Sequence, residues 1–170
     1  MNELPQVTLR ALEPEDLDVL YLIENDPTLW DVGVTNVPYS RFALHEYIAN
    51  VSGNIYVDGQ VRLVVCNADG ETVGMVDLTN FNPRHNRAEV GIVVQKPYQN
   101  KGYGIAALSQ LIAYSRHILH LHQLYALISE SNTKCIKTFE NIGFQRNAEL
   151  ADWLYDGTQY RTALVMQYIL

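Results

Sequence analysis

The sequence predicts an α/β fold of the α+β kind, in which a mixed, mostly antiparallel central sheet has helices on both faces. Two helical patterns follow one another near the start, three strand patterns joined by short turns come next, and strand and helix alternate after that. The 170 residues, 48% of them hydrophobic and 18% charged, suffice for one domain with its own core. We find no linker and no internal repeat, so we expect a single domain over residues 1–170.

The first third of the chain predicts one strand and two helices. Residues 7–12 alternate as a strand, and Pro14 then opens a helix. Residues 26–38 contain Pro, Gly and Asn and are typical of a loop, after which Ser40 can cap a second helix. Both helices have apolar side chains at helical spacing, at Leu17, Leu20 and Ile23 in the first and at Leu44, Tyr47, Ile48 and Val51 in the second.

The remainder of the chain completes the order β-α-α-β-β-β-α-β-α-β-β. The strand patterns lie at residues 61–66, 72–78, 88–94 and 124–128, the last one buried on both faces by its composition. A helical pattern covers 105–119, and another begins at Ser131 or Asn132 and ends at Gly143, a residue suited to a left-handed helix end. Asp156-Gly157 is a turn signal between two final strands.

Charge and cysteine content exclude several classes of function. The net charge of −7, from 12 basic and 19 acidic residues, gives no basic surface for nucleic acid. No apolar run approaches the roughly 20 residues of a membrane helix, and the start has no signal-peptide pattern. Cys66 and Cys135 form no disulfide framework or zinc spacing. We therefore expect a cytoplasmic protein with neither a nucleic-acid nor a membrane partner.

The segment with the most chemical information is Gln99-Asn100-Lys101-Gly102-Tyr103-Gly104, between a strand and a helix. A glycine-bearing loop in this place points backbone N–H groups and the positive end of the helix dipole at an anion such as a pyrophosphate. The sequence has no Gly-Lys-Ser/Thr and no third glycine, which excludes a nucleoside-triphosphatase loop and a dinucleotide fingerprint. By itself, a Gly-x-Gly is equally compatible with a tight helix start that binds nothing.

Two motifs in order resemble those of the GNAT superfamily of N-acetyltransferases. Residues 99–104 are similar to its Q/R-x-x-G-x-G/A signature. Asn132, followed by Phe139-Glu140-Asn141-Ile142-Gly143-Phe144, resembles its second block, an Asn and then Tyr-Glu-x-x-Gly-Phe. Within the family, residues 9–12, 16–17, 38–39 and 117–125 are similar to bacterial spermidine/spermine acetyltransferases, with ribosomal-protein N-terminal acetyltransferases next. The resemblance covers nearly the whole chain and implies acetyl-CoA as cosubstrate, a primary amine or peptide N-terminus as acceptor, and a dimer or larger homo-oligomer.

The resemblance also implies where the coenzyme binds. In the family, the strand before the loop separates from its neighbour, so that backbone amides are free to bind the pantetheine and polarise the thioester carbonyl. Here these amides are those of Ile92, Val93 and Val94. The other expected coenzyme contacts are Gln99, Asn100, Lys101, Gly102, Tyr103, Gly104, Ile105 and Asn132, the last of which can also cap a helix.

Glu89 and Phe139 stand at the positions expected for the base and the acid of acetyl transfer. An alkyl amine has a pKa of about 10.4, so a base must take its proton near neutral pH. Glu89 is the candidate base, although a glutamate on a strand can equally be a surface or ion-paired residue. The family's usual acid is a tyrosine where this chain has Phe139. Water can protonate a thiolate of pKa about 8.5, and the alternative is an acyl-CoA-binding protein without turnover.

The acceptor side and a possible metal site are less sharply defined by the sequence. Glu24, Asp31 and Tyr39 are the expected substrate-binding residues. Polyamine enzymes of the family have a denser acidic cluster here, so a smaller amine, an amino sugar or a protein N-terminus stays open beside spermidine and spermine. His117, His120 and His122 lie at a helix end without a fourth ligand, so we expect no metal. Cys135 is interpreted as a small buried hydrophobic residue.

Overall fold

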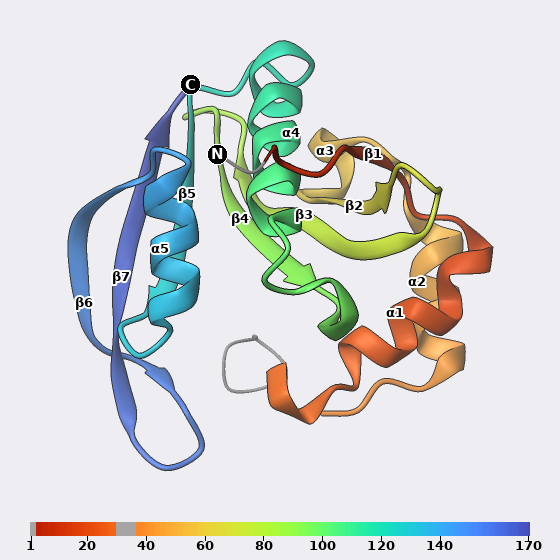
Figure 1. Cartoon of the computed structure of the whole chain (residues 1–170), viewed down its shortest axis with the longest axis horizontal. Coiled ribbons are helices and arrows are strands. Elements are labelled where there is room, and N and C mark those ends of the chain that lie inside the picture. The colour runs from red at the N-terminus through yellow and green to blue at the C-terminus, as the bar shows by residue number, and fades with distance from the viewer. Residues whose placement is uncertain (1–2, 30–36) are drawn as a thin grey trace.

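Seven strands form one sheet in the order β1-β2-β3-β4-β5-β7-β6 (Figure 1). The computed structural model describes residues 3–29 and 37–170. Every neighbouring pair of strands is antiparallel except β4 and β5, which are parallel, so the predicted mixed, mostly antiparallel sheet is confirmed. The strands are β1 (Val7–Ala11), β2 (Val61–Asn67), β3 (Thr72–Asn82), β4 (Arg87–Val94), β5 (Gln123–Ser129), β6 (Gln145–Tyr155) and β7 (Tyr160–Ile169).

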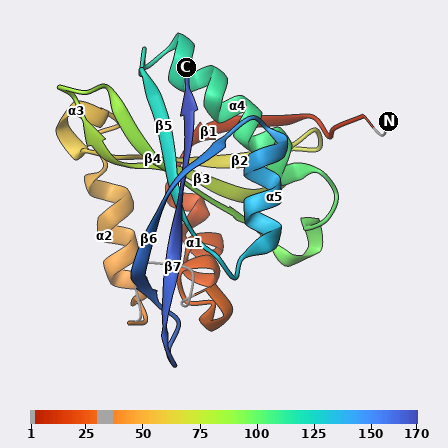
Figure 2. The ribbon, with the colours of Figure 1, turned by 90° about the vertical axis from the view of Figure 1, so that its left-hand side faces the viewer.

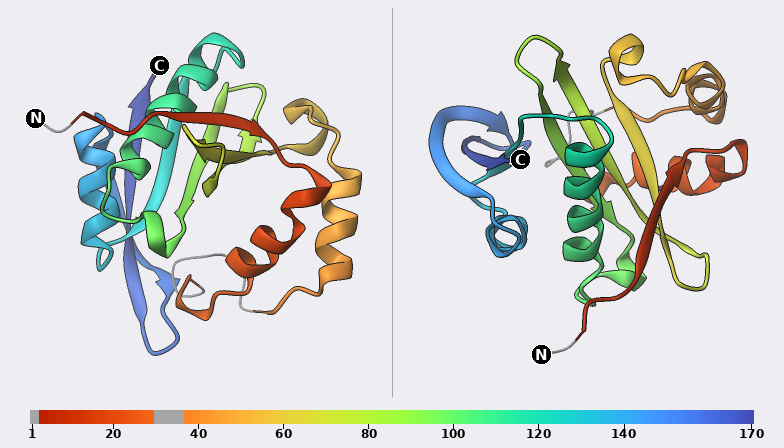
Figure 3. Two further views of the ribbon diagram at one scale, coloured as in Figure 1. Left: turned by 45° about the vertical axis from the view of Figure 1, so that its right-hand side comes forward. Right: turned by 90° about the horizontal axis from the view of Figure 1, so that it is seen from above.

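Helices lie on both faces of the sheet. α4 and α5 pack on one face, and α1 and α2 pack on the other (Figure 3). The helices are α1 (Leu17–Glu24), α2 (Arg41–Asn50), α3 (Ile55–Asp58), α4 (Tyr103–His117) and α5 (Thr133–Asn141), and 3-10 turns occupy Pro14–Asp16, Pro27–Leu29 and Lys96–Tyr98. Among these helices, none is both long enough and apolar enough to cross a bilayer.

Local chemistry explains where the helices begin and end. The hydroxyl oxygen of Ser40 accepts a hydrogen bond of 3.0 Å from the Ala43 amide, and the Asn132 side chain accepts one of 3.2 Å from the Cys135 amide. Gly143, directly after α5, has φ +107°, as predicted for a residue beyond a helix end. α3 was not predicted, because at four residues it is too short to show a helical period.

The sheet separates the core into two clusters. The larger cluster lies under α4 and α5 and includes Leu78, Leu108, Leu111, Leu124 and Met166. The smaller one lies under α1 and α2 and consists of Leu20, Leu44, Val64, Cys66 and Met75. Side chains of one strand alternate between the two clusters, as the two-residue period of a strand requires. The face under α1 and α2 and the face under α4 and α5 therefore each have an apolar cluster of their own.

Four details of the prediction were wrong. β3 ends at Asn82, four residues after the predicted end. Val51 is not on the buried face of α2 but follows the helix and is 40% exposed. α4 ends at His117, two residues before the predicted end. β5 is not buried on both faces: Leu124, Ala126 and Ile128 are buried, whereas Tyr125 and Leu127 are only half-buried. Tyr125 and Leu127 lie close to the place where β5 separates from β4, and the composition of a strand does not reveal such a separation.

The β6–β7 hairpin forms one border of the sheet (Figure 2). Asp156 and Gly157 lie in its turn, as predicted, and Gly157 has φ +94°. β6 is the edge strand and exposes most of its side chains, with Trp153 57% exposed. An edge strand of eleven residues offers unpaired backbone groups to another chain.

Candidate functional site

The parallel pair β4–β5 separates after three residue pairs. Arg87 pairs with Gln123, Ala88 with Leu124, and Glu89 with Tyr125. In the described part of the chain, β4 beyond Glu89 pairs only with β3, while β5 continues against β7. The ribbons of β4 and β5 diverge toward the end where α4 begins (Figure 1). One edge of β4, over residues 90–94, is thereby opened.

The hydrogen-bond pattern of β4 shows which amides face this open edge. The Gln95 amide donates to the Val73 carbonyl at 2.9 Å, and the register between β3 and β4 is regular from there back to Glu89. Because backbone groups of an antiparallel strand alternate in direction, the Val93 amide points toward β3. The amides of Ile92 and Val94 point toward the open edge. The geometry thus favours Ile92 and Val94 over Val93 as donors to a bound molecule.

The loop after β4 presents a second set of amides. Asn100 has φ +61° and Gly102 has φ +87°, so the chain turns sharply before α4 begins. Among the described residues, the amides of residues 100–105 donate no hydrogen bond to any other protein group. Six N–H groups without a protein acceptor at the N-terminus of a fifteen-residue helix are an arrangement suited to binding an anion. The charged side chain of Lys101 belongs to the same turn.

Close packing surrounds the two glycines of this loop. A Cβ atom on Gly102 would lie 3.0 Å from Cδ of Pro5. A Cβ atom on Gly104 would lie 3.8 Å from Cγ2 of Thr138 on α5, which is ordinary contact. Gly102 is therefore required both by its positive φ and by space, whereas Gly104 marks a close approach of α4 and α5.

The side chain of Gln99 is engaged within the protein. Its Nε2 donates to the Val94 carbonyl at 2.9 Å, and its Oε1 accepts from Nζ of Lys134 at 3.5 Å. Gln99 therefore joins the end of β4 to the first turn of α5. Sequence reasoning missed Lys134, although it stands two residues after Asn132 in the second motif. This lysine brings a positive charge, in addition to that of Lys101, close to the loop at 99–104.

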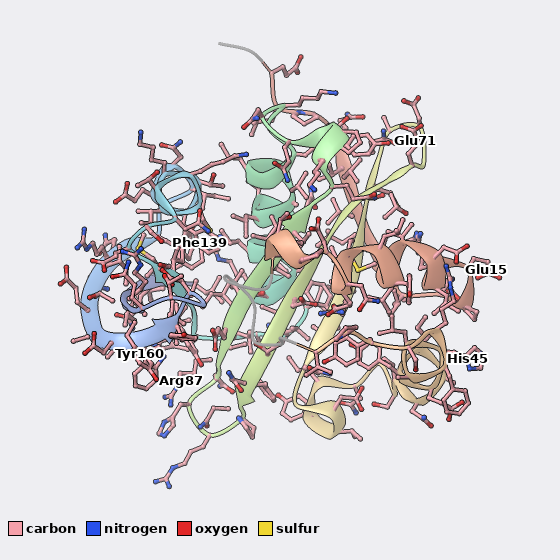
Figure 4. The ribbon with its side chains drawn as sticks, turned by 90° about the horizontal axis from the view of Figure 1, so that it is seen from below. Glu15, His45, Glu71, Arg87, Phe139 and Tyr160 are labelled. Atoms are coloured by element: carbon pink, nitrogen blue, oxygen red, sulfur yellow. The ribbon has the colours of Figure 1, made fainter. Side chains whose placement is uncertain are left out.

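The second motif forms the start and the core of α5. Asn132 caps the helix through the Cys135 amide. Phe139 is 1% exposed, lies inward from α5 (Figure 4), and packs edge-on against Phe144 with ring centroids 4.8 Å apart. Burial raises the pKa of Cys135 to about 11, so its thiol is protonated near neutral pH. Phe139 therefore offers no proton donor there, and the protonated Cys135 thiol is not a nucleophile.

Glu89 lies at the point of separation, on the face under α1 and α2. The next residue, Val90, belongs to the cluster under α4 and α5, so Glu89 projects from the opposite face. Val93, an even number of residues along β4, lies on the same face as Glu89 and pairs with Met75 of the cluster under α1 and α2. The half-buried carboxylate accepts a hydrogen bond of 2.8 Å from the side-chain amide of Asn80. Asn80 is a residue that the sequence did not single out.

The expected substrate residues occupy different settings. Glu24 forms an ion pair with Arg62, which also binds Asp77 at 2.6 Å. Burial acts to lower the pKa of Arg62, but the two carboxylates outweigh it and raise that pKa. The backbone of Tyr39 is held by Asn25, and the side chain is 40% exposed. Asp31 lies outside the described residues. The structure thus brings Glu24 to the same face of the sheet as Glu89.

The candidate metal ligands are not brought together. Across residues 3–29 and 37–170, no three histidine, cysteine, aspartate or glutamate side chains gather as a metal site. His117 ends α4, and His120 has φ +51° in the turn that leads to β5.

Comparison with known proteins identifies relatives of this chain. Residues 6–145 match the family model "Acetyltransferase (GNAT) domain". Spermidine N(1)-acetyltransferase of Escherichia coli K12 is 31% identical over 160 residues, covering 94% of this chain and 84% of that one. A protein of Bacillus subtilis described as a putative ribosomal N-acetyltransferase is 30% identical over 153 residues, covering 88% and 83%.

Solved structures show the same fold. Spermidine N-acetyltransferase from Vibrio cholerae in complex with CoA and spermine superimposes with a TM-score of 0.86 at 28% identity, covering 96% of this chain and 95% of that one. A dodecameric structure of the Vibrio cholerae enzyme superimposes with a TM-score of 0.79 at 28% identity, covering 96% and 94%.

Proposed function

We propose a polyamine acceptor for this chain, which belongs to the GNAT family of acetyltransferases and is therefore an acetyl-CoA-dependent N-acetyltransferase. The observation that supports the proposal most is full-length similarity, near 30% identity, to spermidine N-acetyltransferases, one of which has been solved with CoA and spermine. The opened edge of β4 next to Glu89 is compatible with this chemistry. Spermidine and spermine are the acceptors that we propose.

The coenzyme site that we propose follows from the unbonded amides. The diphosphate of CoA would accept hydrogen bonds from the amides of residues 100–105, with Lys101 and Lys134 adding positive charge. The pantetheine arm would lie along the open edge of β4 and bind the amides of Ile92 and Val94, as an added strand does. Tyr103, Gly104, Ile105 and Asn132 flank this path.

The reaction would proceed by direct transfer. Glu89 takes a proton from the ammonium group, and the lone pair of the amine then forms the new C–N bond at the thioester carbon. An amide of the open β4 edge stabilises the oxygen that becomes negative. As the C–S bond breaks, its electrons leave with the thiolate, and the nitrogen, which is positively charged after the attack, loses its second proton to water. Because position 139 is phenylalanine, water protonates the thiolate. We therefore expect turnover without a tyrosine acid.

The acceptor proposal is also supported by the charge of one face. Glu24, Asp77 and Glu89 lie on the face under α1 and α2, where Glu24 and Asp77 share a single cation, Arg62, and the chain has a net charge of −7. A cation that approaches this face is attracted. Asp31 and Tyr39 remain proposed acceptor contacts.

A thiol-release assay with a panel of amines tests the acceptor. The panel contains spermidine, spermine, an aminoglycoside, an amino acid and a peptide with a free N-terminus. We expect the largest kcat/KM with spermidine or spermine. A preference for the peptide would instead support a ribosomal-protein N-terminal acetyltransferase, the alternative favoured by the Bacillus subtilis relative.

We further propose a homo-oligomer, because the Vibrio cholerae relative is dodecameric and β6 exposes its outer edge here. Light scattering at several protein concentrations measures the assembly, and a monomer at every concentration would contradict it.

A further inference from the structure

Asn80 has a backbone conformation that is uncommon for a residue other than glycine. It has φ +49°, in the left-handed region, and lies where the register between β3 and β4 shifts, between Thr79 and Asn82. Asparagine tolerates this region better than most residues, but glycine adopts it with less strain. A bulge redirects side chains, and such strain gathers at functional sites. Here the bulge directs the Asn80 amide to the Glu89 carboxylate, 2.8 Å away.

Tyr125 approaches Glu89 from the other neighbouring strand. The two residues form the last pair of β4 and β5, so their side chains project from the same face. Burial raises the pKa of Tyr125, and the charge of Glu89 raises it further while Arg87 opposes it. The phenol therefore stays protonated near neutral pH and can donate a hydrogen bond to a carboxylate.

Several charged or titratable groups lie on the strands next to Glu89 and on α1. Arg87 stands two residues earlier on β4, and Tyr125 stands opposite on β5. On β3, Asp77 lies opposite Gly91 and is bound to Arg62, which also holds Glu24 of α1. The Asn80 amide donates to this carboxylate, while Thr79 on β3 and Tyr125 on β5 are the residues paired with Glu89 and carry uncharged hydroxyl groups.

We propose that Asn80 and Tyr125 are positioning residues that hold the Glu89 carboxylate, from β3 and β5 respectively, at the point where β4 and β5 separate. The proposal rests on the proposed function, in which Glu89 accepts the proton of the ammonium group. A carboxylate with donors on both neighbouring strands keeps one orientation and can accept a proton in a fixed direction. The proton that it accepts passes to solvent after the C–N bond has formed and the thiolate has left.

The substitution Asn80→Gly separates positioning from folding. Glycine relieves the backbone strain, so Tm stays the same or rises. The amide donor is lost, so kcat falls roughly tenfold to a hundredfold while KM for acetyl-CoA is unchanged. Asn86→Gly is the matched control, because Asn86 has φ +48° on the exposed β3–β4 turn. We expect this control to leave kcat unchanged. A purely structural role for Asn80 would move kcat only together with Tm.

A double-mutant cycle completes the test, and it uses Asn80→Gly and Tyr125→Phe. In a Glu89→Gln background, neither substitution lowers kcat further. Losses that persist undiminished in that background would overturn the inference alone. A wild-type chain that releases no thiol with any amine would overturn the proposed function together with it.

Discussion

At Gly102 the backbone turns with φ +87° directly before α4, and Pro5 leaves little room for a side chain. We expect Gly102→Ala to weaken CoA binding at least tenfold, because the strained turn would move the amides that surround it. The variant should also lose about 1 kcal/mol of stability. Isothermal titration with CoA measures the affinity, and urea unfolding measures the stability.

Gly157→Ala is the matched control for this experiment. Gly157 has φ +94°, and a Cβ atom there would meet no atom within 4 Å. The same strain therefore arises far from the loop, in the β6–β7 turn, and CoA affinity should be unaffected. Equal losses of CoA affinity in the two variants would show that general destabilisation, rather than the loop at 99–104, controls binding.

At the scale of one element, Asn132 at the start of α5 has two expected roles, which two variants can separate. Its side chain caps the helix, and the family resemblance makes it a coenzyme contact as well. Asn132→Ala should cost about 1 kcal/mol of stability and also weaken CoA binding. Ser40→Ala removes the equivalent cap of α2 and should cost a similar amount without an effect on CoA. If Asn132→Ala binds CoA as the wild type does, Asn132 is only a cap.

The sequence alone predicted most helices and strands but not the details that shape the candidate site. Periodicity and turn residues located every strand and the four longer helices, because apolar spacing and caps such as Ser40 are local signals. The separation of β4 from β5 after Glu89 came only from the family resemblance, since it depends on which strands become neighbours. The bulge at Asn80 and the bond from Gln99 to Val94 had no signal in the sequence, because each depends on a backbone direction fixed by tertiary packing.

At the scale of the whole molecule, Arg62 connects elements that are distant in the sequence. From β2 it binds Asp77 of β3 through two nitrogens, at 2.6 and 3.1 Å, and it also pairs with Glu24 at the end of α1. The guanidinium carbon lies 5.8 Å from the centre of the Tyr47 ring on α2. One side chain, 22% exposed, thereby connects both α1 and α2 to the sheet.

We expect Arg62→Met to lower the free energy of unfolding by about 3 kcal/mol, since two shielded carboxylates would lose their cation. Urea unfolding at neutral pH and one protein concentration measures this loss. Arg146→Met is the control: Arg146 pairs with Glu149 on β6, with side chains 49% and 58% exposed. Solvent screens that pair, so its loss should change stability by no more than about 0.5 kcal/mol. Similar midpoints for the two variants would mean that the connection through Arg62 contributes no more than a surface ion pair, and that other contacts, such as those of Leu20 and Leu44 in the apolar cluster, hold α1 and α2.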